Sequence, residues 1–268
     1  MQVHKIIMTV GVLAFLVVTS ACGDAAKTDE TQKADSSATT TSKKETPSTF
    51  VYNASLDPLI AGAAFSKKIS DTLGFKMFEV TLKHGDSIPM HAHPDHAIYI
   101  LEPGTVLLYT QGRATPDTLT GSKAGDAWIG GPYTDAVKNI GKTQMRFLEI
   151  DFYRPGGREL PVSPAYDSTT DALTLGGESI KVLADTLGIK LFTMTLKPGD
   201  TATMHSHPDH SFYVLEGGEL AVSFKDGPRT TMKLQKGMGM VNGPVSDAAK
   251  NTGKSTLKLL MAHVYRPR

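Results

Sequence analysis

The amino-acid sequence predicts an all-β protein built from two similar β-barrel domains in tandem. The second half of the chain repeats the first, because residues 90–96 return as 204–210 and residues 135–139 return as 247–251. An offset that changes from 114 residues (90 to 204) to 112 (135 to 247) indicates duplicated whole domains with one loop shortened. Each half contains short runs of Val, Ile, Phe, Tyr and Leu between turn sequences, and no long stretch has helical periodicity.

The clearest strand patterns of the first half lie at residues 75–83, 97–101, 106–110 and 145–153. They are separated by Gly-Asp, Glu-Pro-Gly and Gln-Gly sequences, which are typical of turns. The second half has a similar arrangement, and its Lys-Asp-Gly sequence at 225–227 predicts a hairpin. Many short antiparallel strands of this kind favour a barrel or a double-sheet jelly roll in each half.

The start of the chain has the pattern of an export signal. Lys5 precedes an apolar stretch, residues 6–18, that is too short for a membrane span. Residues 19–22, Thr-Ser-Ala-Cys, resemble a lipobox, in which the cysteine becomes the lipidated N-terminus. Cys22 is the only cysteine, so the remaining chain has no disulfide and no thiol nucleophile. We expect residues 1–22 to be a lipoprotein signal peptide with lipidation at Cys22, and a plain secretory leader is the alternative.

The rest of the chain divides into four expected segments. Residues 23–50 hold almost no large apolar side chain, which predicts a flexible tether. We expect the first domain at 51–155, a linker rich in Gly, Pro, Ser and Asp at 156–170, and the second domain at 171–268. This organisation predicts a protein of the cell envelope, anchored by lipid to the membrane on its periplasmic or cell-surface side.

Charge and composition limit the partners. The formal net charge is +1 and the two signs are interspersed, so the chain lacks the basic footprint of a nucleic-acid binder. We expect a small-molecule ligand, no nucleic acid, and contact with a membrane through the N-terminal lipid anchor. Assembly as a homo-oligomer stays open.

Two His-x-His-Pro-Asp-His motifs contain six of the nine histidines. Side chains two positions apart in a strand project from the same face, so the first two histidines of each motif can reach one ion. The Pro-Asp pair breaks the strand, and the third histidine can return to the same point. Neutral imidazole is the commonest metal ligand in proteins, and borderline divalent ions suit it.

These motifs resemble the first motif of the cupin superfamily. That motif is a Gly, five residues, His-x-His, three or four residues and a Glu, followed after six residues by a Gly. Gly85 and Gly199 each stand five residues before the first histidine of a motif. Counting back over six residues from Gly217 leads to His210, so a histidine occupies the family's Glu position.

The second cupin motif, which ends in His-x-x-x-Asn, is matched in its frame. Asn139 and Asn251 fit its last position, but Asp135 and Asp247 stand where the family has its histidine. The resemblance covers about residues 60–268 and implies two tandem cupin (jelly-roll β-barrel) domains. It implies one divalent metal per domain, for which Mn or Fe is favoured and Zn, Ni or Cu is an alternative. The implied metal ligands are His91, His93, His96 and Asp135 in the first domain, and His205, His207, His210 and Asp247 in the second.

Strand parity predicts the surroundings of the metal. The residues two and four positions after the third histidine, Ile98 and Ile100 in the first domain, should share its face. By the same rule Phe212 and Val214 face inward in the second domain. Tyr99 and Tyr213 point the other way and are expected to pack. The methionines at 90 and 204 also fall off the histidine face, which argues against a copper(I) site that uses their sulfur atoms.

One difference between the halves stands out on the last long strand. Glu149 and Asp151 correspond to Met261 and His263. If these side chains face inward, the two sites differ in polarity. A position on an outer or interdomain surface is the alternative.

Two functions fit these features. In the first, the chain is a metal-dependent enzyme, such as an oxygenase, decarboxylase or isomerase, that acts on a small organic acid-like substrate. Four protein ligands on an octahedral ion leave two positions for substrate or O₂. In the second, it is a non-catalytic envelope protein that binds a metal ion or small ligand. No catalytic residue is assigned, although Asp95 or Asp209 could act as a base at the rim of a site.

Overall fold

The computed structural model describes residues 53–120, 122–153 and 166–266. The predicted signal peptide and tether, with Cys22, lie outside these ranges, as does most of the predicted linker. No helix among the described residues is long and apolar enough to span a membrane.

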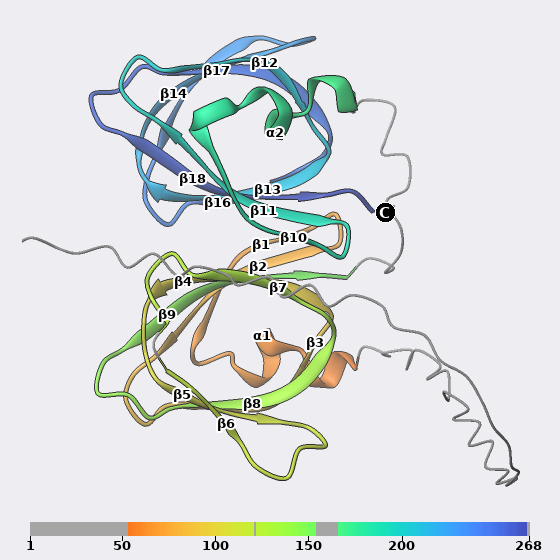
Figure 1. The fold of residues 1–268 in the computed structure, drawn as a ribbon, viewed down its shortest axis with the longest axis vertical. Coiled ribbons are helices and arrows are strands. Elements are labelled where there is room, and N and C mark those ends of the chain that lie inside the picture. Colours follow the sequence, from red (N-terminus) through yellow and green to blue (C-terminus); the bar gives the residue numbers. More distant parts are fainter. Residues whose placement is uncertain (1–52, 121, 154–165, 267–268) are drawn as a thin grey trace, which may run out of the picture. The chain divides into compact units, whose positions relative to one another are not determined.

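The first domain is a barrel of two antiparallel sheets (Figure 1). Its elements in chain order are η1 (Ala54–Leu56), α1 (Pro58–Ala61), β1 (Ser66–Thr72), β2 (Phe75–Leu82), β3 (Ser87–His93), β4 (Asp95–Glu102), β5 (Val106–Thr110), β6 (Asp117–Leu119), β7 (Ala127–Gly130), β8 (Tyr133–Asn139) and β9 (Met145–Phe152). The five-stranded sheet has the order β1-β2-β9-β4-β7, and the four-stranded sheet has the order β3-β8-β5-β6.

The second domain repeats this topology, in teal to blue in Figure 1. Its elements are η2 (Ser168–Thr170), α2 (Ala172–Leu175), η3 (Gly177–Ser179), β10 (Ile180–Thr186), β11 (Ile189–Leu196), β12 (Thr201–His207), β13 (Asp209–Glu216), β14 (Gly218–Phe224), β15 (Arg229–Leu234), β16 (Gly239–Asn242), β17 (Val245–Asn251) and β18 (Leu257–Val264). The sheets have the orders β10-β11-β18-β13-β16 and β12-β17-β14-β15.

The strands predicted from the sequence are present as β2, β4, β5 and β9, and the predicted hairpin joins β14 to β15. The two residues missing from the second half lie between β14 and β16. Val106 of β5 and Leu220 of β14 hold the same register position 114 residues apart, whereas β7 and β16 begin 112 residues apart. Gly217 alone connects β13 to β14, and a Cβ there would lie 2.5 Å from the Leu234 carbonyl oxygen, so this tight connection requires glycine.

Side-chain alternation in the five-stranded sheets builds three cores. On β2, Phe78 and Val80 point into the first barrel, where they pack with Ile98 and Ile100 of β4. A matching core that includes Phe192 fills the second barrel. The opposite faces of the same strands form a third core, in which residues of both domains pack together. Strands buried on both faces explain the continuous apolar runs in the sequence.

Tyr99 and Tyr213 lie in this shared third core, which confirms that they pack away from the histidines. The Tyr213 hydroxyl donates a hydrogen bond to Glu79 Oε1 at 2.7 Å. Arg146 donates to the other oxygen of the Glu79 carboxylate at 2.6 Å. A buried carboxylate with two strong donors avoids the penalty of an unpaired charge, so polar contacts as well as apolar packing join the two domains.

Candidate metal centres

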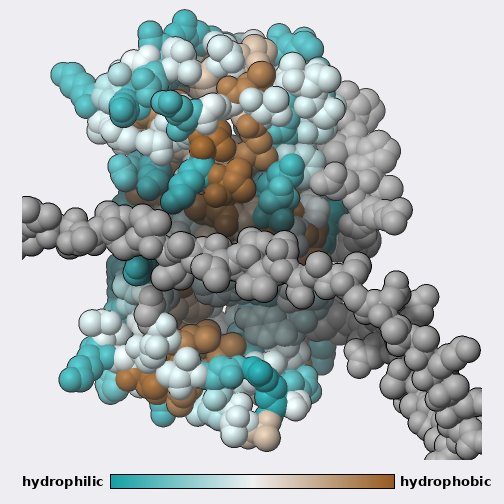
Figure 2. Space-filling view, viewed as in Figure 1, coloured by the Kyte–Doolittle hydropathy of each residue, from teal (hydrophilic) through white to brown (hydrophobic). Residues whose placement is uncertain are grey.

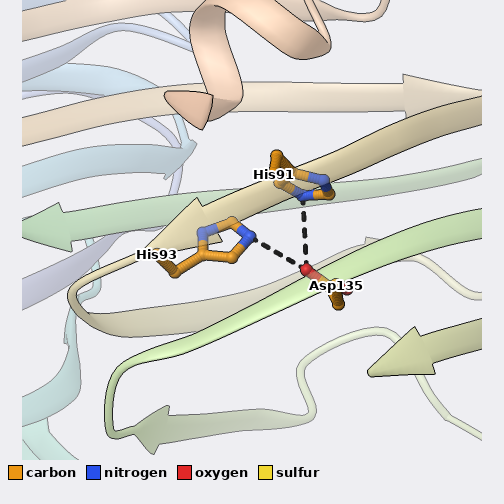
Figure 3. Close-up of side chains that lie close together, drawn as sticks. All are labelled: His91, His93 and Asp135. Carbon is orange, nitrogen blue, oxygen red and sulfur yellow. Dashed lines mark ion pairs between the residues drawn. The ribbon is translucent and has the colours of Figure 1, made fainter. Parts of the chain in front are cut away.

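Two histidines and an aspartate of the first domain converge between neighbouring strands. His91 and His93 lie on β3, and Asp135 lies on β8 directly opposite His91 in the strand register. Asp135 Oδ1 is 3.5 Å from His91 Nε2 and 3.4 Å from His93 Nε2 (Figure 3). All three side chains are buried and point toward one another from the two strands.

The second domain builds the same triad. His205 and His207 lie on β12, and Asp247 on β17 pairs with His205 in the register. Asp247 Oδ1 is 3.8 Å from His205 Nε2, and Oδ2 is 3.6 Å from His207 Nε2. The two triads are therefore copies in geometry as well as in sequence.

A β-bulge in each strand aims these histidines. The pairing of β3 with β8 shifts register between Ile88 and His91, and the pairing of β12 with β17 shifts between Ala202 and His205. Ile88 and His91 can both face the barrel interior only because the bulge changes the parity. Met90, within the bulge, is largely exposed, as parity predicts.

Backbone carbonyl groups fix the tautomers of the first histidine in each motif. His91 Nδ1 lies 2.8 Å from the Pro89 carbonyl oxygen, and His205 Nδ1 lies 2.6 Å from the Thr203 carbonyl oxygen. A carbonyl only accepts, so each Nδ1 carries the hydrogen and donates it. The lone pair of Nε2 then faces the aspartate, as required of a metal ligand.

The surroundings of Asp135 fit a bound cation. Asp135 Oδ1 is buried and makes no hydrogen bond with any described residue. It faces His91 Nε2, whose lone pair would repel it without a cation between them. Ligand atoms about 2.1 Å from one ion are separated by about 3.0–3.4 Å, close to the distances observed here. A divalent metal between these atoms would satisfy all of them.

The third histidine of each motif lies beside its triad and not within it. The ligand atoms of each triad lie within 4.8 Å of one another, and neither His96 nor His210 belongs to that group. The His96 and His210 rings are 5.4 and 4.7 Å from the rings of His93 and His207. Both come from the five-stranded sheet, and the His96 ring rests on Gly130, where a Cβ would be 2.5 Å away. The structure thus assembles three of the four predicted ligands and places the fourth at the edge of the site.

Burial keeps most of these imidazoles neutral. Desolvation lowers the pKa of His91 and of His96 from the ordinary value. It lowers the pKa of His207 far more, with help from the neighbouring His210, and that of His210 to about 4. Neutral imidazoles are the form that binds metal, so these four histidines need lose no proton to bind it at physiological pH.

His93 is the exception, because two buried carboxylates lie behind its ring. Burial lowers its pKa, but Glu149 together with Asp135 and Asp151 outweighs burial and raises the pKa well above its usual value. His93 Nδ1 lies 2.7 Å from Glu149 Oε1 and 3.4 Å from Asp151 Oδ1. Burial raises the pKa of Glu149 to about 7. Both acids therefore face inward, which settles the alternative that the sequence left open.

The equivalent positions of the second domain carry no charge. His207 Nδ1 lies 2.9 Å from His263 Nε2, in the place of Asp151. His263 Nδ1 lies 3.3 Å from the Tyr265 hydroxyl, which donates to Asp171 Oδ2 at 2.8 Å. Asp171 also caps α2 by accepting from the Leu173 N–H. The two sites thus have the same candidate metal ligands but different surroundings.

The first triad opens into a cavity of about 790 Å³. Its wall is mainly apolar and includes Ile98, Phe147 and Trp128, as parity predicted for Ile98. Tyr133 also lines it and stacks on His93 with ring centroids 5.0 Å apart. Sequence reasoning missed Tyr133, although its position two residues before Asp135 on the same strand could have shown that both face inward.

The second cavity is smaller, about 350 Å³, and rich in methionine. Phe212 lines it, as parity predicted. Figure 2 shows apolar side chains gathered within each of the two barrels and surrounded by hydrophilic residues. Sequence reasoning missed the methionines of the wall, which are Met194, Met232, Met240 and Met261.

The aspartate of the first Pro-Asp pair is held in an ion pair. Asp95 Oδ2 forms an ion pair with Arg266 Nη1 at 2.5 Å, and the Arg266 side chain is almost completely buried. This pair connects the histidine motif of the first domain to the C-terminal segment of the second. Asp209 is buried as well.

No protein-family model matches the chain. Among curated proteins it is similar to the cAMP-dependent protein kinase regulatory subunit of Debaryomyces hansenii, with 27% identity over 181 residues. The match covers 64% of this chain and 38% of that protein, so the chain spans well under two-thirds of the relative's length.

Several solved structures are similar to about three-quarters of the chain. AerE from Microcystis aeruginosa superposes with a TM-score of 0.52 at 13% identity, over 75% of this chain and 97% of that one. The cupin 2 conserved barrel domain protein from Leptotrichia buccalis gives 0.43 at 16% identity, over 74% and 88%. A variant of oxalate decarboxylase from Bacillus subtilis gives 0.49 at 15% identity, over 78% and 71%. At 13% identity the match to AerE shows a shared fold alone.

The fold is that of two tandem cupin jelly-roll barrels, each formed by a five-stranded and a four-stranded antiparallel sheet. This confirms the fold class predicted from the sequence. The His/Asp triads in both barrels suit a divalent metal ion.

Proposed function

We propose that the chain is a metal-dependent bicupin enzyme that holds one divalent ion in each triad and acts on a small organic molecule in the first barrel. The observation that carries the proposal is the orphaned Asp135 Oδ1, which faces His91 and His93 at the edge of a large apolar cavity. His96 and His210 would complete the two ligand sets by a small side-chain movement.

The first cavity suggests the class of substrate. None of the described residues that line it is a lysine or an arginine. An acidic group of the substrate would therefore be recognised by the ion, and its apolar body would lie against side chains such as Trp128 and Phe147. When bound, the ion supplies Lewis-acid and template chemistry. Tyr133, which stacks on His93, would orient the substrate beside it.

Metal content tests the sites directly. We expect about one equivalent of divalent metal per barrel in the purified protein, measured by inductively coupled plasma mass spectrometry. The double variants His91→Ala/His93→Ala and His205→Ala/His207→Ala should each lose about one equivalent. Met90→Ala/Met204→Ala, at the exposed neighbouring positions, is the matched control and should lose none. Unchanged metal in both histidine variants would reject the sites.

Turnover distinguishes an enzyme from a binding protein. The metal-loaded protein is incubated with a panel of small aromatic and aliphatic carboxylic and hydroxy acids. Oxygen consumption and product masses identify an oxygenase, a decarboxylase or an isomerase. Activity should be lost in the His91/His93 variant and retained in the His205/His207 variant. Saturable binding without product would favour the non-catalytic alternative.

We also propose that the protein is attached to the cell envelope by lipid at Cys22. The support is the lipobox-like sequence that ends at the only cysteine of the chain. Labelling with a fatty-acid analogue in a bacterial host should mark the wild type and not Cys22→Ala. Equal labelling of both proteins would exclude this site.

A further inference from the structure

We propose that the two metal centres select different ions: a hard cation such as Mn(II) in the first barrel and a soft one such as Cu(I) in the second. The inference rests on the proposed function, because it requires both triads to bind metal. The residues that surround the triads differ between the two repeats, although the triads themselves are the same.

The differing residues occupy the same places in the two barrels. Asp151 on β9 is paired with His96, and His263 on β18 is paired with His210. Two positions earlier, Glu149 and Met261 are likewise equivalent. The two barrels therefore differ at matched positions of the same architecture.

In the first barrel these positions add negative charge behind a ligand. The Glu149 and Asp151 carboxylates lie 2.7 and 3.4 Å from His93 Nδ1, and both are almost completely buried. A carboxylate on the far nitrogen makes an imidazole a stronger donor. Buried negative charge on these carboxyl groups also attracts a cation several ångströms away, since water screens it little. Hard, oxygen-preferring ions gain most from such a site.

In the second barrel the same positions are neutral and contain sulfur. His207 Nδ1–H donates to His263 Nε2, and the hydrogen-bonded chain continues to Tyr265. Met194 and Met261 line the spaces on both sides of His205 and His207.

Thioether sulfur is soft and polarisable, so it favours Cu(I) and disfavours Mn(II). Four methionines line the second cavity, and their counterparts in the repeat are Val80, Leu119, Trp128 and Glu149. The methionines at 90 and 204, which lie off the histidine face, are not among these four.

Single-centre proteins make the comparison measurable. The His205→Ala/His207→Ala protein keeps only the first centre, and the His91→Ala/His93→Ala protein keeps only the second. Each is titrated anaerobically with Mn(II) and, under reducing conditions, with Cu(I) against a chromophoric chelator. We expect the ratio of Mn(II) to Cu(I) affinity to be about 100-fold higher for the first centre, since outer groups typically change affinity by about 10–100-fold each.

Exchanging the residues that surround the triads tests whether they cause the difference in metal selectivity. In the first-centre protein, Glu149→Met/Asp151→His should lower Mn(II) affinity about 100-fold and raise Cu(I) affinity. In the second-centre protein, Met261→Glu/His263→Asp should do the reverse. Glu149→Gln/Asp151→Asn removes the charge while it keeps the shape, so it should lower Mn(II) affinity even if the larger exchange disturbs folding. Asp71→Asn, an exposed carboxylate on β1, is the control and should change nothing.

The outcomes separate the two proposals. Two centres that bind metal with equal selectivity, and exchanges without effect, would overturn this inference and leave the proposed metal sites intact. Wild-type protein that binds neither ion would overturn both.

Discussion

At the scale of single residues, Asp135 and Asp247 determine how the site is interpreted. Each stands where the cupin motif has a histidine, and each faces two imidazole Nε2 atoms across the strand pair. A carboxylate that faces nitrogen lone pairs is unfavourable without a cation between them. Because a histidine in turn occupies the family's Glu position, each candidate centre still has three imidazoles and one carboxylate.

Asp135→Asn separates the metal role from the structural one. Without metal, the variant should be less stable than the wild type, because Asp135 no longer stabilises the protonated His93 ring. With Mn(II), the wild type should gain several degrees in melting temperature through ligand linkage, and the variant much less. Differential scanning calorimetry of chelator-treated and metal-loaded samples measures both. An equal metal-dependent gain in the two proteins would rule out Asp135 as a ligand.

His210 should make the metal-free protein sensitive to acid. Its pKa is about 4 in the folded state and about 6.5 in a model peptide, so the unfolded chain binds a proton first as pH falls. The free energy of unfolding then decreases between about pH 6.5 and pH 4, by roughly 3 kcal/mol at most from this residue. Urea unfolding of the chelated protein at several pH values measures this decrease. His210→Gln should show a shallower slope, and an identical slope would exclude His210 as the cause.

At the scale of strands and turns, the Asn that ends each motif has a structural task. Asn139 at the end of β8 donates to the Leu82 and Thr143 carbonyl oxygens and accepts from the Gly141 N–H. Asn251 at the end of β17 makes the equivalent bonds. Both side chains are completely buried. The match to the cupin motif at these positions therefore reflects turn geometry and not metal binding.

Asn139→Ala should lower the free energy of unfolding by about 1–3 kcal/mol, because buried carbonyl groups lose their donors. Lys138→Ala, at the exposed neighbouring position, should change it by less than about 0.5 kcal/mol. Chemical denaturation compares the two variants with the wild type. If both had equal effects, the buried hydrogen bonds would not be what stabilises this turn.

The strands show which structural features the sequence patterns can predict. Val106–Thr110 was predicted with its observed bounds, and parity placed Tyr213 and Phe212 on the correct faces because β13 alternates without interruption there. Parity did not decide whether Glu149 faces the barrel interior, because β9 is buried on both sides. The bulge before His91 and the position of His96 beside the triad depend on three-dimensional packing, which local patterns do not encode.

At the scale of the whole described chain, a shared core and a few buried polar contacts unite the two barrels. The outer faces of both five-stranded sheets contribute to one apolar cluster, with Phe75 and Leu191 among its completely buried members. The ion pair between Asp95 and Arg266 runs between the domains, so the first histidine motif is held in part by the second barrel.

Breaking this ion pair should destabilise the protein. Arg266→Met leaves the Asp95 carboxylate buried without its cation, and we expect a loss of about 3–5 kcal/mol in the free energy of unfolding. Asp95→Asn/Arg266→Met should recover much of that loss, because neither charge then remains. A double-mutant cycle by urea unfolding measures the coupling. Additive effects would show that the two side chains do not stabilise each other.

The shared core has a consequence for how such a chain could arise. A single repeat, produced alone, would present the outer face of its five-stranded sheet to water and could cover it by pairing with a second identical copy. In such a symmetric dimer every substitution occurs twice, so both centres must change together. Joining the copies in one polypeptide removes that constraint, and Glu149 can differ from Met261 while the common framework stays the same.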